Sequence, residues 1–216
     1  ALRQLYGGIR EGAPDLETLH LDNMNPITIT EWPDASRECI RIIAEHNTPG
    51  DTAAFGLESA DPRVQAENNL NVTAEECFEA VKIVNEEAGW RPGEDAEAAP
   101  THGEGAANRL PKLLPGINLL HGLKAEREET YEHNREFLQR VYDEGLMLRR
   151  INIRQVMAFD GTDMSETGAE IAHDHKELFK SYKKEIRQQI DQPMLERVTP
   201  QGTVLPDVHL EYHQDG

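Results

Sequence analysis

Short apolar segments alternate with longer amphipathic segments along this chain, and this alternation is the feature that most constrains its fold. Four apolar segments have the length and composition of strands, at residues 16–23, 52–59, 116–123 and within 146–159. Segments with helical periodicity follow them, at residues 37–46, 74–88, 126–144 and 169–191. Because strands that alternate with helices pair in parallel, the sequence predicts an α/β fold with one parallel sheet.

Local signals predict where several of these elements begin and end. Ser36 is expected to cap the helix that follows the first strand, and Thr73 opens a capping box before the next helix. Pro193 is expected to stop the last long helix. The residues after it predict two short strands around Pro200 and Gly202.

Charge and composition exclude several classes of function. The chain of 216 residues has a formal charge of −18, from 40 acidic and 22 basic residues, which disfavours generic binding to nucleic acid or anionic lipid. The acidic residues are dispersed, which suggests adaptation to high salt, with an ordinary acidic cytoplasmic protein as the alternative. No apolar stretch approaches the ~20 residues that span a membrane. The two cysteines, Cys39 and Cys77, are expected to be buried in helices, which fits a reducing, cytoplasmic compartment.

Polar or glycine residues follow each predicted strand directly. They are Asp22, Glu58, Ser59, Gly122 and Gly161. Because parallel sheets bind ligands at the carboxyl ends of their strands, these positions are candidates for a binding site. The alternative is that Glu58 and Ser59 only begin a polar loop in front of the next helix.

The fourth predicted strand carries polar side chains on one face. With a period of two, Ile151, Ile153 and Gln155 alternate with Asn152, Arg154 and Val156. An arginine inside a fold needs an anionic partner. For Arg154 that partner is either the carboxylate of a ligand or the carboxylate of Asp22 or Glu58.

Three of the strand-end segments resemble a known family. They are "FGLES" at residues 55–59, "GLKAER" at 122–127 and "FDGT" at 159–162. In the same order, they resemble the turns after the fourth, fifth and sixth barrel strands of radical S-adenosylmethionine (SAM) enzymes, in particular archaeal proteins predicted to be iron–sulfur oxidoreductases. The resemblance implies a partial (βα) barrel at residues 1–192, with a long loop at 89–115, and the start of a truncated β appendage at 193–216.

The resemblance also implies a chemistry. The full-length parent would bind SAM and a [4Fe–4S] cluster and cleave SAM reductively to a 5′-deoxyadenosyl radical. The implied cofactor-binding residues are Glu58, Ser59, Asn69, Gly122, Leu123, Arg154 and Gln155; for Asn69, and for Asn71 beside it, hydrogen bonding within the loop is an equal alternative. Ala125 and Arg127 depart from the glycine and threonine that are usual in the fifth turn.

A larger departure is that the chain lacks the three-cysteine motif Cys-x3-Cys-x2-Cys that binds the cluster. The chain is therefore expected to be an internal fragment that is inactive alone and has no metal ligands of its own.

Two other functions remain open from the residues alone. The chain could be a non-catalytic α/β binding or scaffold domain. It could also be a barrel hydrolase that uses a metal held among Asp22, Glu58 and His121, although the nine histidines lack the spacing of a zinc site. A barrel that lacks strands exposes a strand edge, so self-association or partial disorder is expected, with residues 89–115 as the least ordered stretch.

Overall fold

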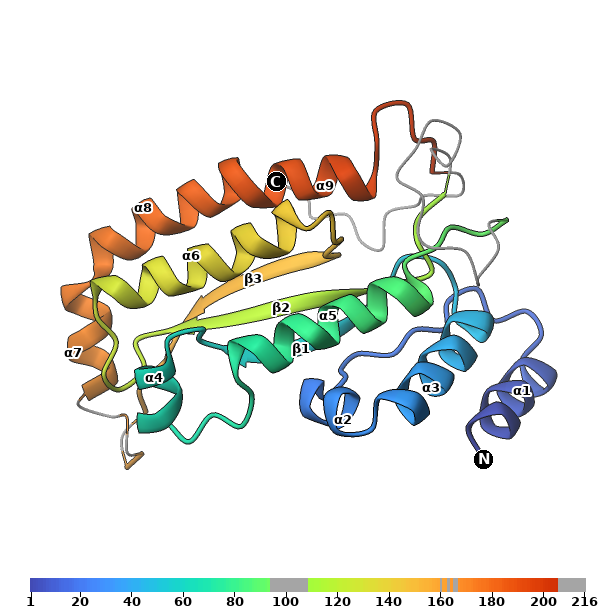
Figure 1. The fold of residues 1–216 in the computed structure, drawn as a ribbon, viewed down its shortest axis with the longest axis horizontal. Helices are drawn as coiled ribbons and strands as arrows, with labels where there is room; N and C mark the ends of the chain where they lie inside the picture. Colours follow the sequence, from blue (N-terminus) through green and yellow to red (C-terminus); the bar gives the residue numbers. More distant parts are fainter. Residues whose placement is uncertain (94–108, 160, 163, 165–166, 206–216) are drawn as a thin grey trace, which may run out of the picture.

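The computed structural model describes residues 1–93, 109–159, 161–162, 164 and 167–205, and within it three strands form one parallel sheet. The strands are β1 (Asp51–Glu58), β2 (Leu113–His121) and β3 (Arg150–Gln155), and they lie side by side in the order β1-β2-β3 (Figure 1). The predicted α/β fold with a parallel sheet is therefore confirmed for three of the four expected strands.

Helices precede, connect and follow the strands. Before β1 come α1 (Leu2–Gly12), α2 (Pro26–Glu31) and α3 (Pro33–His46). Between strands lie α4 (Pro62–Glu67), α5 (Ala74–Ala88) and α6 (Glu128–Asp143), and after β3 come α7 (Thr167–Asp174), α8 (Lys176–Ile186), the π-helical turn η1 (Arg187–Asp191) and α9 (Gln192–Val198).

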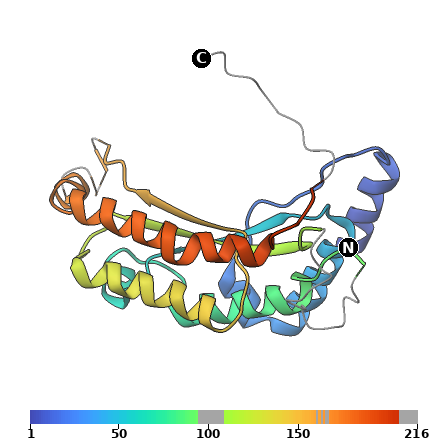
Figure 2. The same ribbon diagram turned by 90° about the horizontal axis from the view of Figure 1, so that it is seen from above.

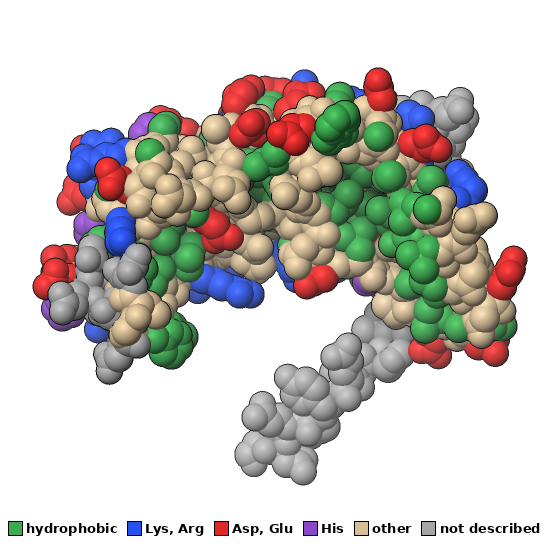
Figure 3. All heavy atoms as spheres, turned by 90° about the horizontal axis from the view of Figure 1, so that it is seen from below, with side chains coloured by type: hydrophobic (Ala, Val, Ile, Leu, Met, Phe, Trp, Pro, Cys, Tyr) green, Lys and Arg blue, Asp and Glu red, His purple; other side chains and the backbone are tan. Residues whose placement is uncertain are grey.

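The helices cover one face of the sheet. Figure 2 shows α5 and α6 on one side of the strands, with α8 and α9 alongside α6. In the part of the chain that the structure describes, no helix lies across the opposite face, and Figure 3 shows the molecule hollowed on that side. We call this surface the open face.

The core lies between the sheet and the helices because alternate strand residues point toward the helical layer. Phe55 of β1 and Ile117 of β2 are both fully buried there, together with Val81 of α5. The alternate residues of β3 follow the predicted pattern, since Ile151 and Ile153 are buried in this core. Asn152 and Arg154, which alternate with them, therefore belong to the open face.

The predicted strand at residues 16–23 does not form a regular strand. Asn23 makes a single parallel bridge to Ala54 of β1. Further back, the side-chain carboxylate of Asp51 accepts the backbone N–H of Leu21, in place of a backbone carbonyl. Pro26 then starts α2, so the segment leaves the sheet after one bridge.

Two helix boundaries also differ from the prediction. Helix α3 starts at Pro33, three residues before the expected cap at Ser36, because proline has the fixed φ that suits a first helical turn. Pro193 does not end the last helix, since the π-helical turn before it leads into α9 and places Pro193 in that helix's first turn. The capping box of Thr73 and Glu76 is confirmed.

Other expectations concern the loop, the tail and the cysteines. Residues 94–108 of the predicted loop and residues 206–216 of the tail lie outside the described residues. Of the two strands predicted there, the first is replaced by α9 up to Val198, and Pro200 and Thr203 form a hydrogen-bonded turn after it, whereas most of the second lies outside the described residues. Cys77 is buried as expected, whereas Cys39 is exposed because it lies on the outer side of α3.

Candidate functional site

The three strands end at the same edge of the sheet, at the left of Figure 1. The opposite edge, at the amino ends, is held by cationic side chains that donate to backbone carbonyls. Arg149 Nε donates to the Gly50 carbonyl at 3.3 Å, and Lys112 Nζ donates to the Asn47 carbonyl at 2.8 Å. These contacts join elements of the fold, which leaves the carboxyl edge as the place to look for a ligand.

Glu58 closes β1 in an unusual backbone conformation. The pairing with β2 shifts between Gly56 and Glu58, and Glu58 has a φ of 61°. This left-handed conformation is unfavourable for a residue with a side chain. A Cβ atom at Gly56 would stand 3.0 Å from Glu58 Oε1, so the carboxylate lies back over Gly56. The bulge and the glycine together place a carboxylate on the open face.

The charge of Glu58 is poorly solvated at this position. Burial raises the pKa of its carboxyl above the ordinary value, and the positive charge of Arg154 opposes the shift. Arg154 itself is exposed on β3. Arg154 therefore acts on Glu58 only through its charge, across the width of the sheet, and which of the expected anions it would pair with stays a prediction.

A row of small and amide side chains crosses the open face beside Glu58. Gly56, Asn118 and Asn152 share one register across the three strands. Asn152 Nδ2 donates to Asn118 Oδ1 at 2.9 Å. This row is polar and uncharged, and the missing side chain of Gly56 leaves its β1 end open.

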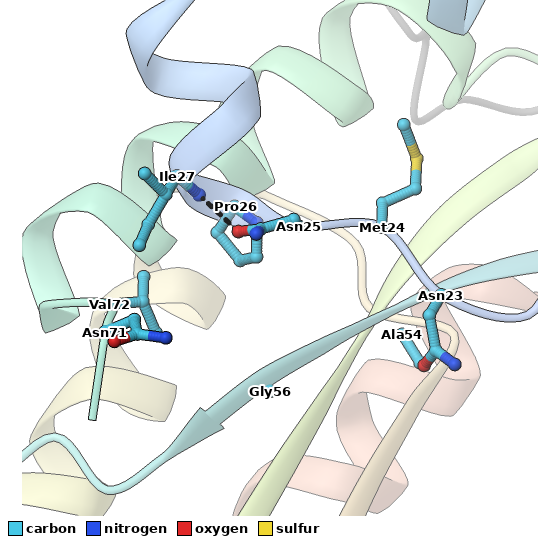
Figure 4. Close-up of a pocket in the computed structure, with 9 residues that line it drawn as sticks. All are labelled: Asn23, Met24, Asn25, Pro26, Ile27, Ala54, Gly56, Asn71 and Val72. Atoms are coloured by element: carbon cyan, nitrogen blue, oxygen red, sulfur yellow. Dashed lines mark hydrogen bonds between the residues drawn. The ribbon is translucent and has the colours of Figure 1, made fainter. Parts of the chain in front are cut away.

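A pocket of about 500 Å³ begins where this row reaches the outer edge of β1 (Figure 4). Its lining residues carry amide or apolar side chains and are Asn23, Met24, Asn25, Pro26, Ile27, Ala54, Gly56, Asn71 and Val72. None of these described lining residues carries a charge. The pocket therefore suits a ligand that combines apolar surface with neutral hydrogen-bonding groups.

The backbone of Gly56 also faces this pocket. Ala54 uses its outward N–H and C=O to bond Asp22 and Met24. In a strand, alternate residues direct these groups to the same side, so those of Gly56 point outward as well. The segment that bonds Ala54 turns away into α2 before it reaches Gly56. The N–H and C=O of Gly56 therefore provide a donor and an acceptor at the pocket wall.

Other predicted site residues have different surroundings. Ser59 is fully buried, and its Oγ accepts the N–H of Asp61 at 3.2 Å, so it shapes the turn after β1. Asn69 is exposed and does not line the pocket, although Asn71 does. The neighbouring Asn68, which was not predicted, makes a loop contact, because its Nδ2 donates to the Lys124 carbonyl at 3.0 Å.

The predicted residues on β2 and β3 divide between the two sides of the sheet. Gly122 and Leu123 are buried in the turn after β2. Gln155 is half-buried and follows the core-facing residues of β3, whereas Arg154 belongs to the open face. Glu58 and Arg154 are thus the charged predicted residues that the structure brings to one surface.

The set Asp22, Glu58 and His121 does not form a site. His121 is completely buried and packs against Tyr131 and Tyr182 on the helical side of the sheet. Glu58 lies over the open face, on the other side. The metal site expected for a hydrolase is therefore wrong, because the side chains of Glu58 and His121 point to opposite faces of the sheet.

Sequence reasoning missed a buried carboxylate, Glu126, in the turn after β2. Its Oε2 accepts the N–H of Gly122 at 2.8 Å, and its Oε1 accepts the hydroxyl of Tyr131 at 3.0 Å. Burial alone would raise the pKa of Glu126, but His121 and His175 beside it and the Gly122 N–H lower the pKa below its ordinary value. The only sequence signal was its position directly ahead of an amphipathic helix, and a carboxylate at such a position usually faces solvent.

No group of three or more histidine, cysteine, aspartate or glutamate side chains that could hold a metal ion occurs among the described residues. The helices in the same ranges include none that is long and apolar enough to cross a bilayer.

Comparison with known proteins finds archaeal relatives. The chain is 46% identical over 211 residues to an uncharacterized protein of Methanocaldococcus jannaschii, and 41% identical over 211 residues to one of Archaeoglobus fulgidus. Each match covers 98% of this chain but only 36% and 37% of the relatives. The chain thus spans little more than a third of the length of the curated relatives it matches. No family model matches the chain.

Proposed function

We propose that β1, β2 and β3 are consecutive strands of a partial (βα) barrel that belongs to a longer radical SAM iron–sulfur enzyme. Two features support the barrel. The strands follow one another in chain order, and the connecting helices cover a single face of the sheet. A doubly wound sheet would reverse its strand order and carry helices on both faces. The hollowed open face would be the barrel interior.

Glu58 is the residue on which the proposal mainly depends. Its strained backbone holds a half-buried carboxylate beside Gly56, and Gly56 itself lines the amide-lined pocket. Strained residues of this kind concentrate at ligand sites. In the proposal Glu58 accepts hydrogen bonds from the ribose hydroxyls or the amino group of SAM. The positive charge of Arg154 favours the ionised form of Glu58. SAM, when bound, supplies one-electron chemistry that the protein positions and shields from water.

The iron–sulfur cluster does not fit the residues of this chain. A cluster needs a set of cysteine thiolates. Of the two cysteines, Cys39 is exposed on α3 and Cys77 is buried in α5, where burial raises the pKa of its thiol and keeps it protonated. The proposal therefore assigns the cluster ligands to a part of the parent protein outside this chain.

The test uses the longer parent, reconstituted anaerobically with iron and sulfide. We expect about four irons per chain and conversion of SAM to methionine and 5′-deoxyadenosine in the presence of a reductant. Glu58→Gln should weaken SAM binding by roughly 10- to 100-fold, the range for losing a hydrogen bond to a charged group. Glu67→Gln, on the exposed end of α4, is the matched control. Absence of both iron and SAM cleavage in the reconstituted parent would overturn the proposal.

The alternative is a non-catalytic α/β binding or scaffold domain, which the neutral, amide-lined pocket favours. The coding sequence ahead of Ala1 distinguishes the two. A Cys-x3-Cys-x2-Cys motif within about a hundred codons ahead of Ala1 supports the radical SAM proposal, because the missing barrel strands would occupy about that length of chain. A start codon directly before Ala1 supports the binding domain.

Two further properties belong to the same proposal. The dispersed acidic surface suits a salt-loving archaeal cytoplasm, and Figure 3 shows acidic side chains spread over the helical side. The outer edge of β3 pairs with no strand in the described ranges, so a second copy or the remaining parent chain is the proposed partner there. Light scattering of the isolated chain checks this, because a strictly monomeric chain at all concentrations would exclude the second copy.

A further inference from the structure

The turn between β2 and α6 and the junction between α7 and α8 meet at one buried carboxylate. The Glu126 side chain is 1% exposed. Besides the Gly122 N–H and the Tyr131 hydroxyl, it meets His175 of the α7–α8 junction, with His175 Nδ1 3.1 Å from Oε1. Two segments that are separate in the sequence, residues 122–131 and the α7–α8 junction, thus share one acceptor.

Aromatic side chains pack around this carboxylate from the same elements. The ring of His121 stacks on Tyr131 with centroids 4.4 Å apart, and it meets Phe179 and Tyr182 of α8 edge-on at 5.5 and 5.1 Å. His121 Nδ1 also lies 3.2 Å from Glu126 Oε2. The start of α8 is therefore docked against the end of β2 through rings as well as through His175.

The turn that Glu126 holds is itself strained. Ala125 has a φ of 63°, a left-handed conformation that is unfavourable for a residue with a side chain, so the segment from Gly122 to Arg127 would relax if its contacts were lost. Asn68 holds one side of the turn through the backbone of Lys124. Glu126 holds the other side through the Gly122 N–H, and His175 in turn orients Glu126.

We infer that His175, acting through Glu126, is a positioning residue for the turn at residues 122–127, so that docking of the α7–α8 junction sets the conformation of this turn. The importance of the turn for a cofactor rests on the function proposed above. The coupling itself is a property of the described residues. It can therefore be tested on this chain without any ligand, and its failure would leave the proposed function untouched.

Amide hydrogen exchange followed by NMR is the direct test. His175→Phe keeps an aromatic ring but removes the donor, and we expect exchange of the Gly122 amide to quicken about tenfold relative to amides of β1. His175→Asn, which restores a donor, should recover most of the protection. His173→Asn, at an exposed position on α7, is the matched control and should change nothing. Equal exchange of Gly122 in the Phe variant and the unaltered chain would overturn the inference.

A second measurement needs no substitution and covers the case in which His175→Phe does not fold. As pH is varied, the chemical shift of the Gly122 amide should change with the same midpoint as the chemical shifts of the His175 ring protons. The other titratable groups that face Glu126 are His121 of β2 and Tyr131 of α6, with Tyr182 of α8 against their rings. Their own resonances identify their titrations. A Gly122 amide that does not follow His175 would contradict the coupling.

Discussion

The backbone of Glu58 offers a sharp test of why a carboxylate stands at the end of β1. With a φ of 61°, Glu58 lies in the left-handed region, which costs a residue with a side chain about 1–2 kcal/mol. Glycine removes this strain but loses about 0.5–1 kcal/mol to its larger freedom in the unfolded chain. Glu58→Gly should therefore raise the free energy of unfolding by roughly 0–1.5 kcal/mol, although it deletes a half-buried side chain.

Urea denaturation measures this change directly, and for a domain of this size 1 kcal/mol corresponds to a shift in melting temperature of roughly 2–4 °C. Ala125→Gly calibrates the experiment, because Ala125 has a φ of 63° and should show a gain of the same size. A chain destabilised by more than about 1 kcal/mol in Glu58→Gly would refute the reasoning. In that case the side chain would serve the fold, and the strain would be no sign of a ligand.

Glu58→Gln separates the charge from the backbone strain. Burial raises the pKa of Glu58, so the folded chain binds a proton more tightly than the unfolded chain, and stability falls as pH rises through the window above the ordinary carboxyl value. The Gln variant should therefore be more stable than the unaltered chain near neutral pH. That advantage should vanish below about pH 4, where the carboxyl is protonated in both states. An advantage independent of pH would contradict this assignment.

Four further predictions concern the rest of the molecule. Phe55→Ala empties a fully buried site under β1 and should lower the free energy of unfolding in urea by about 3–5 kcal/mol. Asn85→Ala leaves the Met147 N–H and C=O without their side-chain partners, and should cost about 1–3 kcal/mol in the same assay. Because the pKa of Glu126 is lowered, its ionised carboxylate stabilises the fold at pH values above the ordinary glutamate pKa, and this stability is lost as pH falls. Glu126→Gln should therefore make the free energy of unfolding less dependent on pH on the acid side. Raising potassium chloride from 0.1 to about 2 M should increase the melting temperature, because salt screens the repulsion within a chain of charge −18; a flat response would argue against salt adaptation.

Local sequence patterns predicted those features that depend on neighbouring residues. The capping box at Thr73 and the alternation of Ile151 and Ile153 with polar residues were both found as expected. The same kind of reasoning failed at residues 16–23, where the apolar pattern fits a strand. The carboxylate of Asp51, 30 positions away, takes the place of a backbone partner there.

The sequence also located the carboxyl end of β1. It was singled out because the carboxyl ends of strands in a βα repeat are candidate positions for ligands. The sequence could not show which of its polar residues faces the open side. Glu58 and Ser59 are adjacent, yet a bulge directs one carboxylate over Gly56, while the serine is buried in the following turn.

By itself, then, the sequence determined the parallel α/β class and the order of three of its four expected strands, because periodicity and caps act over a few residues. Only the tertiary structure decided the shape of the pocket and the contacts of Glu126. His175 and Glu126 are 49 positions apart, and they meet only because α8 packs beside α6. Contacts of this kind depend on how whole helices dock, and the pattern within any single segment does not contain that information.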